Sequence, residues 1–282
     1  MEIRKVAVLI TVFNRKKTTL AGLKTLKESI SKLGKGYTFD IFLVDDNSPD
    51  GTYEAVKNNF PEVFAYQGSG SLYWTRGMQL AWEKALSNDN YDYFLWFNDD
   101  GELYADALIT LFKTSDDNGS NSCVVTGAFC DHNGEASYIG MDNDEQFIIP
   151  NGTYQKVAIM FGNIVLIPQK VCEAVGTMNC IFTHGGGDNE YGFRVQQKGF
   201  SVIQTPIYIG VVDNHHEHPY FEGKTFCERW KYLHSPKYSP FPIFYYLFKY
   251  RGKWRAIKYI ASRYFYLFFP KTFKNIDHRT SS

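Results

Sequence analysis

The first 130 residues alternate between short apolar runs and segments in which apolar residues recur every three or four positions. The runs are rich in Val, Ile, Leu and Phe and lack polar alternation, so they predict strands that are buried on both faces. Repeated strand–helix–strand units with short connections predict a parallel sheet with helices on both faces. Strands are predicted at 5–13, 39–46, 63–67, 92–101 and 123–129, and helices near 20–30, 52–59, 72–86 and 105–113.

The pattern is less regular from residue 131 onward. Two glycine-rich ends bound a helical segment, as expected where glycine terminates a helix. The following apolar stretch predicts one or two strands, and a polar, histidine-rich stretch comes after it. The predicted elements are a long strand at 157–168, a short helix at 171–175, a helix at 185–199, strands at 200–212 and an irregular segment at 213–219.

The chain is formally neutral, but its charge is unevenly distributed. Residues 224–282 hold 13 Lys and Arg against 2 Asp and Glu, a net charge of +11, and they carry 18 of the aromatic residues. The first 223 residues have a net charge of −11. Basic residues interleaved with aromatic ones are typical of nucleic-acid surfaces and of helices on anionic membranes. A helical cap on the preceding domain is the third interpretation.

Composition excludes several classes of protein. Hydrophobic residues make up 44% and charged residues 21%, which is ordinary for a folded chain. No apolar run approaches the roughly 18 residues of a spanning helix. The first apolar run is followed by Asn14 and Arg15, so it is interpreted as a strand and not as a signal peptide. Five cysteines without a C-x-x-C pair argue against a disulfide framework and fit a reducing cytoplasm.

Polar residues gather where three of the predicted strands end. Open α/β sheets bind ligands at the carboxyl ends of their strands. Adjacent carboxylates repel each other unless they share a cation, and oxygen ligands suit Mg²⁺ or Mn²⁺. Each cluster also has the composition of an ordinary turn, but three together favour a ligand site. The clusters are Thr11, Phe13, Asn14 and Arg15, then Asp45 and Asp46, and then Asn98, Asp99 and Asp100.

Phosphate-binding glycine motifs are absent from the sequence. Neither G-x-G-x-x-G nor G-x-x-x-x-G-K-[ST] occurs after the first strand, which disfavours a dinucleotide fold and a P-loop ATPase. A nucleoside diphosphate held through a metal ion remains compatible with the acidic clusters. The expected fold class is therefore α/β with a ligand at one edge of the sheet.

Four segments, in order, resemble the bacterial family-two glycosyltransferases of GT-A fold: VAVLITVFNR, FLVDDNSPDGT, LWFNDDGELY and GGGDNEYGFRVQQKGF. The resemblance spans about residues 5–220. It implies that Asp45 or Asp46 receives the nucleotide base. It also places 98–100 at the family's D-x-D motif, which holds the divalent metal and the donor diphosphate. Asp100 matches the metal-binding second Asp, Asp99 lies between, and Asn98 replaces the first Asp.

The same resemblance identifies a general base. Asp188 matches it, and Gly187 stands where the family usually has Glu. A carboxylate within reach of a sugar hydroxyl can take its proton as the new bond forms. Asp188 also has the position of a helix N-cap, which is compatible with that role. Glu190 is the rival base, and Arg194, one turn further on, is a candidate contact for a charged acceptor group.

The loop at 68–77 matches the family segment near the donor sugar and diphosphate. Arg76 is a candidate phosphate contact, while Tyr73 and Trp74 are candidates to stack on a sugar, with core packing as the ordinary alternative. The resemblance also implies a histidine as a remaining metal ligand. His215 and His216 both fit that position, and with His218 they suggest zinc less strongly than an oxygen-rich site.

These features together predict an inverting sugar transferase that uses a nucleotide-diphosphate sugar and Mn²⁺ or Mg²⁺. The acceptor would be a cell-surface glycan or a lipid-linked sugar. Residues 1–130 would form the donor half, 131–223 the catalytic half, and 224–282 a tail on the inner membrane face, with no nucleic-acid partner. A sugar nucleotidyltransferase and a non-catalytic glycan-binding relic are the alternatives. The first of these usually has glycines after strand one, where TVFNRKK has none.

Overall fold

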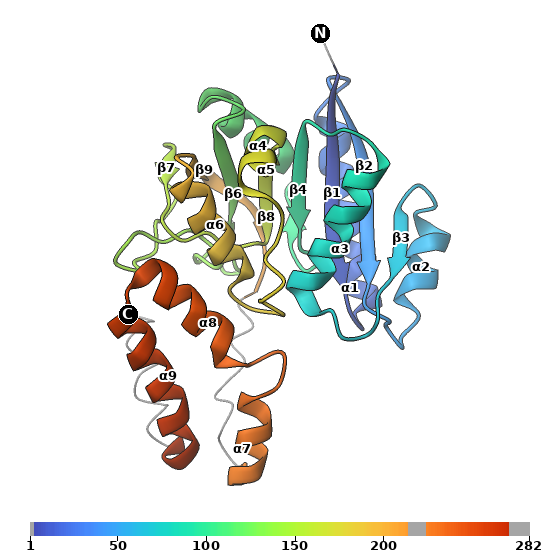
Figure 1. Ribbon diagram of the computed structural model, residues 1–282. Coiled ribbons are helices and arrows are strands. Elements are labelled where there is room, and N and C mark those ends of the chain that lie inside the picture. The colour runs from blue at the N-terminus through green and yellow to red at the C-terminus, as the bar shows by residue number, and fades with distance from the viewer. Residues whose placement is uncertain (1–2, 214–223, 271–282) are drawn as a thin grey trace. The chain divides into compact units, whose positions relative to one another are not determined.

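The computed structural model describes residues 3–213 and 224–270 (Figure 1). These residues form two compact units. The first comprises 3–180 and 187–213, and the second comprises 181–186 and 224–270. The sequence pattern does not predict that 181–186 belongs to the second unit.

The first unit is built on one mixed sheet with the strand order β3-β2-β1-β4-β8-β6-β9-β5, and β7 pairs with β9. Strands β3, β2, β1 and β4 are parallel, as are β6 and β9, whereas β8, β5 and β7 pair antiparallel with their neighbours. The α/β fold is thus confirmed, and the parallel character is concentrated in the first half. The strands are β1 Arg4–Val12, β2 Tyr37–Asp45, β3 Phe64–Gln67, β4 Tyr93–Phe97, β5 Glu102–Leu103, β6 Cys123–Cys130, β7 Gln155–Lys156, β8 Ile164–Pro168 and β9 Ser201–Val211.

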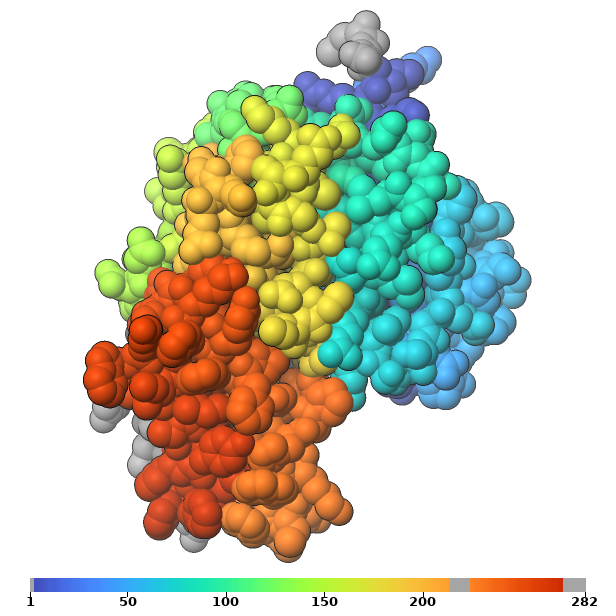
Figure 2. All heavy atoms as spheres, in the orientation of Figure 1, coloured from blue at the N-terminus to red at the C-terminus, as the bar shows by residue number. Residues whose placement is uncertain are grey.

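Helices cover both faces of this sheet, because its strands are apolar on both sides. Leu26 and Phe112, from α1 and α4, belong to one buried cluster. Trp82 and Tyr191, from α3 and α6, belong to the other. In the view of Figure 2, side chains of α3 and α6 cover the sheet. The helices are α1 Lys16–Lys32, α2 Thr52–Asn59, α3 Tyr73–Asn88, α4 Ala107–Asp117, α5 Gln169–Val175 and α6 Gly187–Gln197.

Two predicted strands are wrong in part. The strand expected at 92–101 is β4, which ends at Phe97 because the polar residues after it form a turn. The long strand expected at 157–168 is a strand only at β8, Ile164–Pro168. Before it, the Phe161 carbonyl accepts the Thr126 hydroxyl at 3.1 Å, and the Asn163 carbonyl accepts the Asn98 amide at 2.8 Å. Residues 160–163 therefore lie outside the hydrogen-bond pattern of the sheet. They lie beside the end of β4 and the first turn of α6.

The second unit is helical, as expected for the tail. It contains α7 Phe226–Leu233, α8 Pro240–Tyr246, a π-helical turn η1 Leu247–Arg251 and α9 Lys253–Phe268. Its buried cluster is small and includes Leu233 and Leu267. In the two described stretches of chain, no helix has both the length and the hydropathy needed to cross a membrane.

Candidate active site

The carboxyl ends of β2, β1 and β4 lie next to one another in the parallel part of the sheet. The register pairs Val12 with Asp45 and Leu9 with Trp96, so the loops that follow these strands meet at one edge. This edge carries the three polar clusters that the sequence places at strand ends.

Asp46 is fully engaged by the backbone. Its carboxylate accepts the amides of Gly70 at 2.7 Å, Leu72 at 2.8 Å and Tyr73 at 3.0 Å. These three donors precede or begin α3, where intrahelical acceptors are lacking. Asp46 therefore fixes the loop that leads into α3.

Asp45 differs from its neighbour in having an unsatisfied oxygen. Its Oδ1 accepts the Ser48 amide at 3.1 Å and the Ser48 hydroxyl. Its Oδ2 is buried, and no hydrogen bond in the described part of the chain reaches it. Burial raises the pKa of Asp45, and the hydrogen bonds from Ser48 oppose that rise.

Arg15 joins the end of β1 to the acidic segment after β4. Its guanidinium lies 2.7 Å from Asp99 Oδ1 and 3.2 Å from Asp100 Oδ2. The Thr19 hydroxyl donates to Asp99 Oδ2 at 2.5 Å. Burial raises the pKa of Asp99 to about 6, against the opposing effect of Arg15.

Asp100 has one oxygen on Arg15 and one that is buried without a hydrogen-bond partner in residues 3–213 and 224–270. A buried carboxylate oxygen of this kind suits Mg²⁺ or Mn²⁺, because both prefer oxygen ligands. The described residues contain no group of three or more His, Cys, Asp or Glu side chains that could hold a metal by themselves. The residues present therefore fit a cation that shares its ligands with a bound diphosphate.

A short chain of contacts connects this acidic segment to Asp188. The Trp74 indole N–H donates to Asn98 Oδ1 at 2.7 Å. A Cβ on Gly162 would lie 2.8 Å from the Trp74 ring, and the Gly162 amide donates to Asp188 Oδ2 at 2.9 Å. Burial raises the pKa of Tyr138, and the negative charges of Asp100 and Asp188 raise it further.

Asp188 lies in the first turn of α6. Its Oδ1 accepts the Asn189 amide at 2.9 Å, and burial raises its pKa. The preceding glycine packs against α3, since a Cβ on Gly187 would lie 2.6 Å from Thr75 Oγ1. A side chain at 187 would therefore require Thr75 or the two helices to move.

Glu190 and Arg194 form an ion pair on α6, and Arg194 also bonds to backbone carbonyls outside the helix. The Arg194 Nε donates to the buried Glu190 at 2.9 Å. Its two terminal nitrogens donate to the carbonyls of Val175 and Thr177 at 2.9 and 2.7 Å. This arrangement ties α6 to the segment after α5.

The remaining predicted residues occupy varied positions. Thr11 is buried, whereas Phe13 is exposed. Asn14 has a φ of 53° and donates its amide to the Ser48 hydroxyl at 2.7 Å. Arg76 is exposed, and its Nε donates to the Cys180 carbonyl at 3.3 Å. The predicted metal ligands His215 and His216, and the nearby His218, lie outside the described residues.

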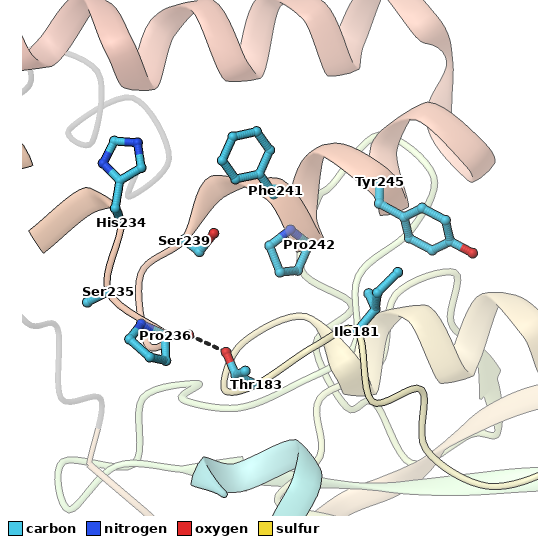
Figure 3. A pocket seen from close by; sticks show the side chains of 9 residues that line it. All are labelled: Ile181, Thr183, His234, Ser235, Pro236, Ser239, Phe241, Pro242 and Tyr245. Carbon is cyan, nitrogen blue, oxygen red and sulfur yellow. Dashed lines mark hydrogen bonds between the residues drawn. The ribbon is translucent and has the colours of Figure 1, made fainter. Parts of the chain in front are cut away.

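The second unit contains a pocket of about 470 Å³ (Figure 3). Apolar side chains and proline rings form much of its wall, and the Thr183 hydroxyl closes one side by donating to the Pro236 carbonyl. No residue predicted for donor, metal or base binding lines it. Its lining consists of Ile181, Thr183, His234, Ser235, Pro236, Ser239, Phe241, Pro242 and Tyr245.

Sequence patterns missed three residues at this site. Gly162 lies inside a segment predicted as strand, and the glycine itself was the only signal of an interruption. Tyr138 follows an irregular loop with no motif. Thr19 lies on a helix face, where its bond to Asp99 depends on tertiary packing.

The fold is a mixed α/β domain with an acidic edge at the carboxyl ends of its parallel strands. The chain belongs to glycosyl transferase family 2, whose model matches residues 7–176. No curated protein matches the chain.

Two solved structures share the fold at 14% identity. A mannosyltransferase, PcManGT from Pyrobaculum calidifontis in complex with GDP-Man and Mn²⁺, has a TM-score of 0.56 over 83% of this chain. GalNAc-T7 with UDP, GalNAc and Mn²⁺ has a TM-score of 0.57 over 82% of this chain. The matches span 62% and 48% of those two chains.

Replacing Asp46 tests whether it is a scaffold residue. An amide in its place cannot accept all three backbone donors, so Asp46→Asn should lower the free energy of unfolding by about 2–3 kcal/mol. Asp106→Asn is the control, because Asp106 is exposed and makes no side-chain cap bond. Urea unfolding measures both. Equal stability of the two variants would contradict the assignment.

Asp99 should make stability depend on pH. Its pKa is raised from 3.8 to about 6, so the native state holds a proton that the unfolded state has lost between these values. The stabilisation is complete below about pH 4 and is lost as pH rises through 6, an effect of about 2–3 kcal/mol. Asp99→Asn mimics the protonated form and should remove this component. Urea unfolding of both proteins at pH 4 to 7 with EDTA measures it, and parallel curves would refute it.

Proposed function

We propose that the protein transfers a sugar from a nucleoside-diphosphate sugar to an acceptor hydroxyl, with inversion at the anomeric carbon. The observation that carries this proposal is the connection of Asp188 to the acidic segment through Gly162, Trp74 and Asn98. These contacts support a site in which the proposed base lies close to the proposed diphosphate-binding segment. The two structural neighbours, whose names mention GDP-Man or UDP together with Mn²⁺, support the same donor class.

The donor is bound by the loops after β1, β2 and β4. Asp45 is the better candidate than Asp46 for the nucleotide base, because its Oδ2 is buried and has no hydrogen bond within the described chain. Arg15 supplies positive charge for the diphosphate. Thr11, Phe13, Asn14, Arg76, Asn98 and Asp99 complete the proposed donor site.

Asp100 is the proposed protein ligand for Mn²⁺ or Mg²⁺, through the buried oxygen that lacks a hydrogen-bond partner in the described residues. His215 or His216 is proposed as a further ligand. A bound divalent cation would stabilise negative charge on the departing diphosphate. Asn98 contributes position rather than charge, since its carbonyl is held by Trp74.

Asp188 is the proposed general base. Each of its oxygens accepts one backbone amide, and a carboxylate retains further acceptor sites for an incoming hydroxyl. Its raised pKa makes it a stronger base than an ordinary aspartate. The acceptor oxygen bonds to the anomeric carbon, the bond to the diphosphate oxygen breaks, and the hydroxyl proton passes to Asp188. Glu190 is a weaker candidate because it is buried against Arg194.

The acceptor is proposed to be a cell-surface glycan or a lipid-linked sugar, with Trp74 beside it. Arg194 is better explained as a scaffold residue than as an acceptor contact, given its bonds to Val175 and Thr177. Residues 224–282 are proposed to hold the protein on an anionic membrane surface at the inner face of the cell membrane. Their net charge of +11 supports that partner.

Removing the proposed metal ligand should abolish cation-dependent donor binding. Asp100→Ala is expected to lower the affinity for a nucleoside diphosphate with Mn²⁺ at least tenfold, without lowering the thermal transition. Titration calorimetry of GDP and UDP with Mn²⁺ measures this. Asp144→Ala is the control, because Asp144 lies in an exposed turn. Unchanged affinity in Asp100→Ala would exclude Asp100 as the ligand.

Asp188→Asn distinguishes a role of Asp188 as general base from a role in donor binding. It should keep donor affinity near normal and reduce transfer by about 10²–10⁴-fold, as expected for loss of a general base. Release of nucleoside diphosphate from a panel of nucleotide sugars with Mn²⁺ is the assay. A nucleotidyltransferase would release pyrophosphate instead, and a binding relic would release nothing. If Glu190→Gln were inactive while Asp188→Asn transferred normally, Glu190 would be the base.

A further inference from the structure

One face of α9 leaves large apolar side chains in solvent. Trp254, Ile257, Phe265 and Phe268 are spaced so that, at 3.6 residues per turn, they lie within an arc of about 80°. A soluble helix normally turns such a stripe toward a core. Here the four side chains are 46% to 78% exposed, and large exposed apolar surfaces mark interaction sites.

Helix α7 widens this surface. The Phe226 ring lies 5.4 Å from that of Phe268, and the Trp230 ring lies 6.1 Å from that of Tyr264 on α9. Both α7 residues are more than 40% exposed. The two helices belong to the same unit (Figure 1). We call the six residues Phe226, Trp230, Trp254, Ile257, Phe265 and Phe268 the aromatic face.

The charge around the aromatic face is almost entirely positive, and the one acidic residue in 224–270, Glu228 of α7, is engaged with Thr225 in a capping box. Residues 229–270 contain nine Lys and Arg and no Asp or Glu. On α9, Lys253, Arg255 and Lys258 are exposed beside the apolar stripe. The face therefore combines an apolar, aromatic-rich centre with cationic flanks, the composition of helices that lie in a membrane interface.

We propose that the aromatic face inserts into the headgroup region of an anionic bilayer, with α9 parallel to the membrane plane. Sixteen residues of helix extend about 24 Å, less than a spanning helix needs. Trp and Phe side chains fill the interface, and the flanking amines meet lipid phosphates. The role of this membrane contact in catalysis rests on the proposed function, whereas the geometry of the aromatic face does not depend on it.

Charge and layout disfavour two other occupants. A second copy would bring two surfaces together that each carry nine excess positive charges in residues 224–270, and such surfaces repel. A nucleic acid would require cations along the centre of the surface, where phosphates bind. In this unit the centre is apolar and the cations lie beside it.

Membrane attachment of this unit is relevant to the reaction because of the chain order. Residues 181–186 belong to the same unit as α7 and α9. Gly186 packs against Ile243 of α8 and comes two residues before Asp188. The segment that leads into the proposed base is therefore part of the unit that binds the bilayer, which suits an acceptor anchored in that bilayer.

The test compares two double variants of the full-length protein. Trp254→Ser/Phe268→Ser removes both ends of the stripe. Phe147→Ser/Ile149→Ser is the matched control, with side chains 48% and 52% exposed in the first unit. Co-sedimentation with phosphatidylglycerol-containing vesicles and with neutral phosphatidylcholine vesicles measures partitioning at low and high salt, and circular dichroism checks folding.

Wild type and control should bind anionic vesicles, less strongly in high salt and on neutral lipid. The stripe variant should bind at least tenfold more weakly. No binding by wild type, or equal loss in the control, would overturn the proposal. So would a stripe-dependent dimer on gel filtration, or displacement from vesicles by a duplex oligonucleotide. Donor hydrolysis should be unchanged in the stripe variant, and its absence in wild type with vesicle binding intact would refute only the proposed function.

Discussion

Four carboxylates crowd the carboxyl ends of β2 and β4, and the site depends on how each is stabilised away from water. Burying an unpaired carboxylate is costly, so each needs a partner or remains ready for one. Asp46 takes three backbone amides, and Asp99 takes Arg15 and Thr19. Asp45 and Asp100 each retain a buried oxygen that no described residue bonds. The site thus has two acidic oxygens prepared for a ligand.

Two residues near these carboxylates, Asn98 and Gly187, differ from the motifs that the resemblance implies. Asn98 removes one negative charge from a segment that already holds Asp99 and Asp100, and its carbonyl is used by the Trp74 indole. Gly187 lies so close to α3 that a Cβ there would come within 2.6 Å of Thr75 Oγ1. Asn98 is linked to Asp188 through Trp74 and Gly162, and Gly187 directly precedes the proposed base. They are therefore compatible with an active transferase.

The second unit combines three features that a simple helical cap does not need. It has an exposed apolar stripe, ten Lys and Arg against one acidic residue in 224–270, and a segment that leads directly to α6. Because its buried cluster is small, the charge and exposed apolar side chains of this unit indicate its role better than its core does. These features are the ones on which the proposed insertion into an anionic bilayer rests.

The sequence by itself determined the strand and helix order, because apolar periodicity is local, and it placed the acidic clusters at strand ends. Helix α2 was predicted to the residue, and the polar residues meet at one edge because parallel strands share their direction. Only the tertiary structure distinguished Asp45 from Asp46, paired Arg15 with Asp99 and Asp100, and interrupted the strand at Gly162. These outcomes depend on which backbone amides and guanidinium groups lie opposite a carboxylate. Such partners lie far apart in the sequence, so no local sequence pattern predicts them.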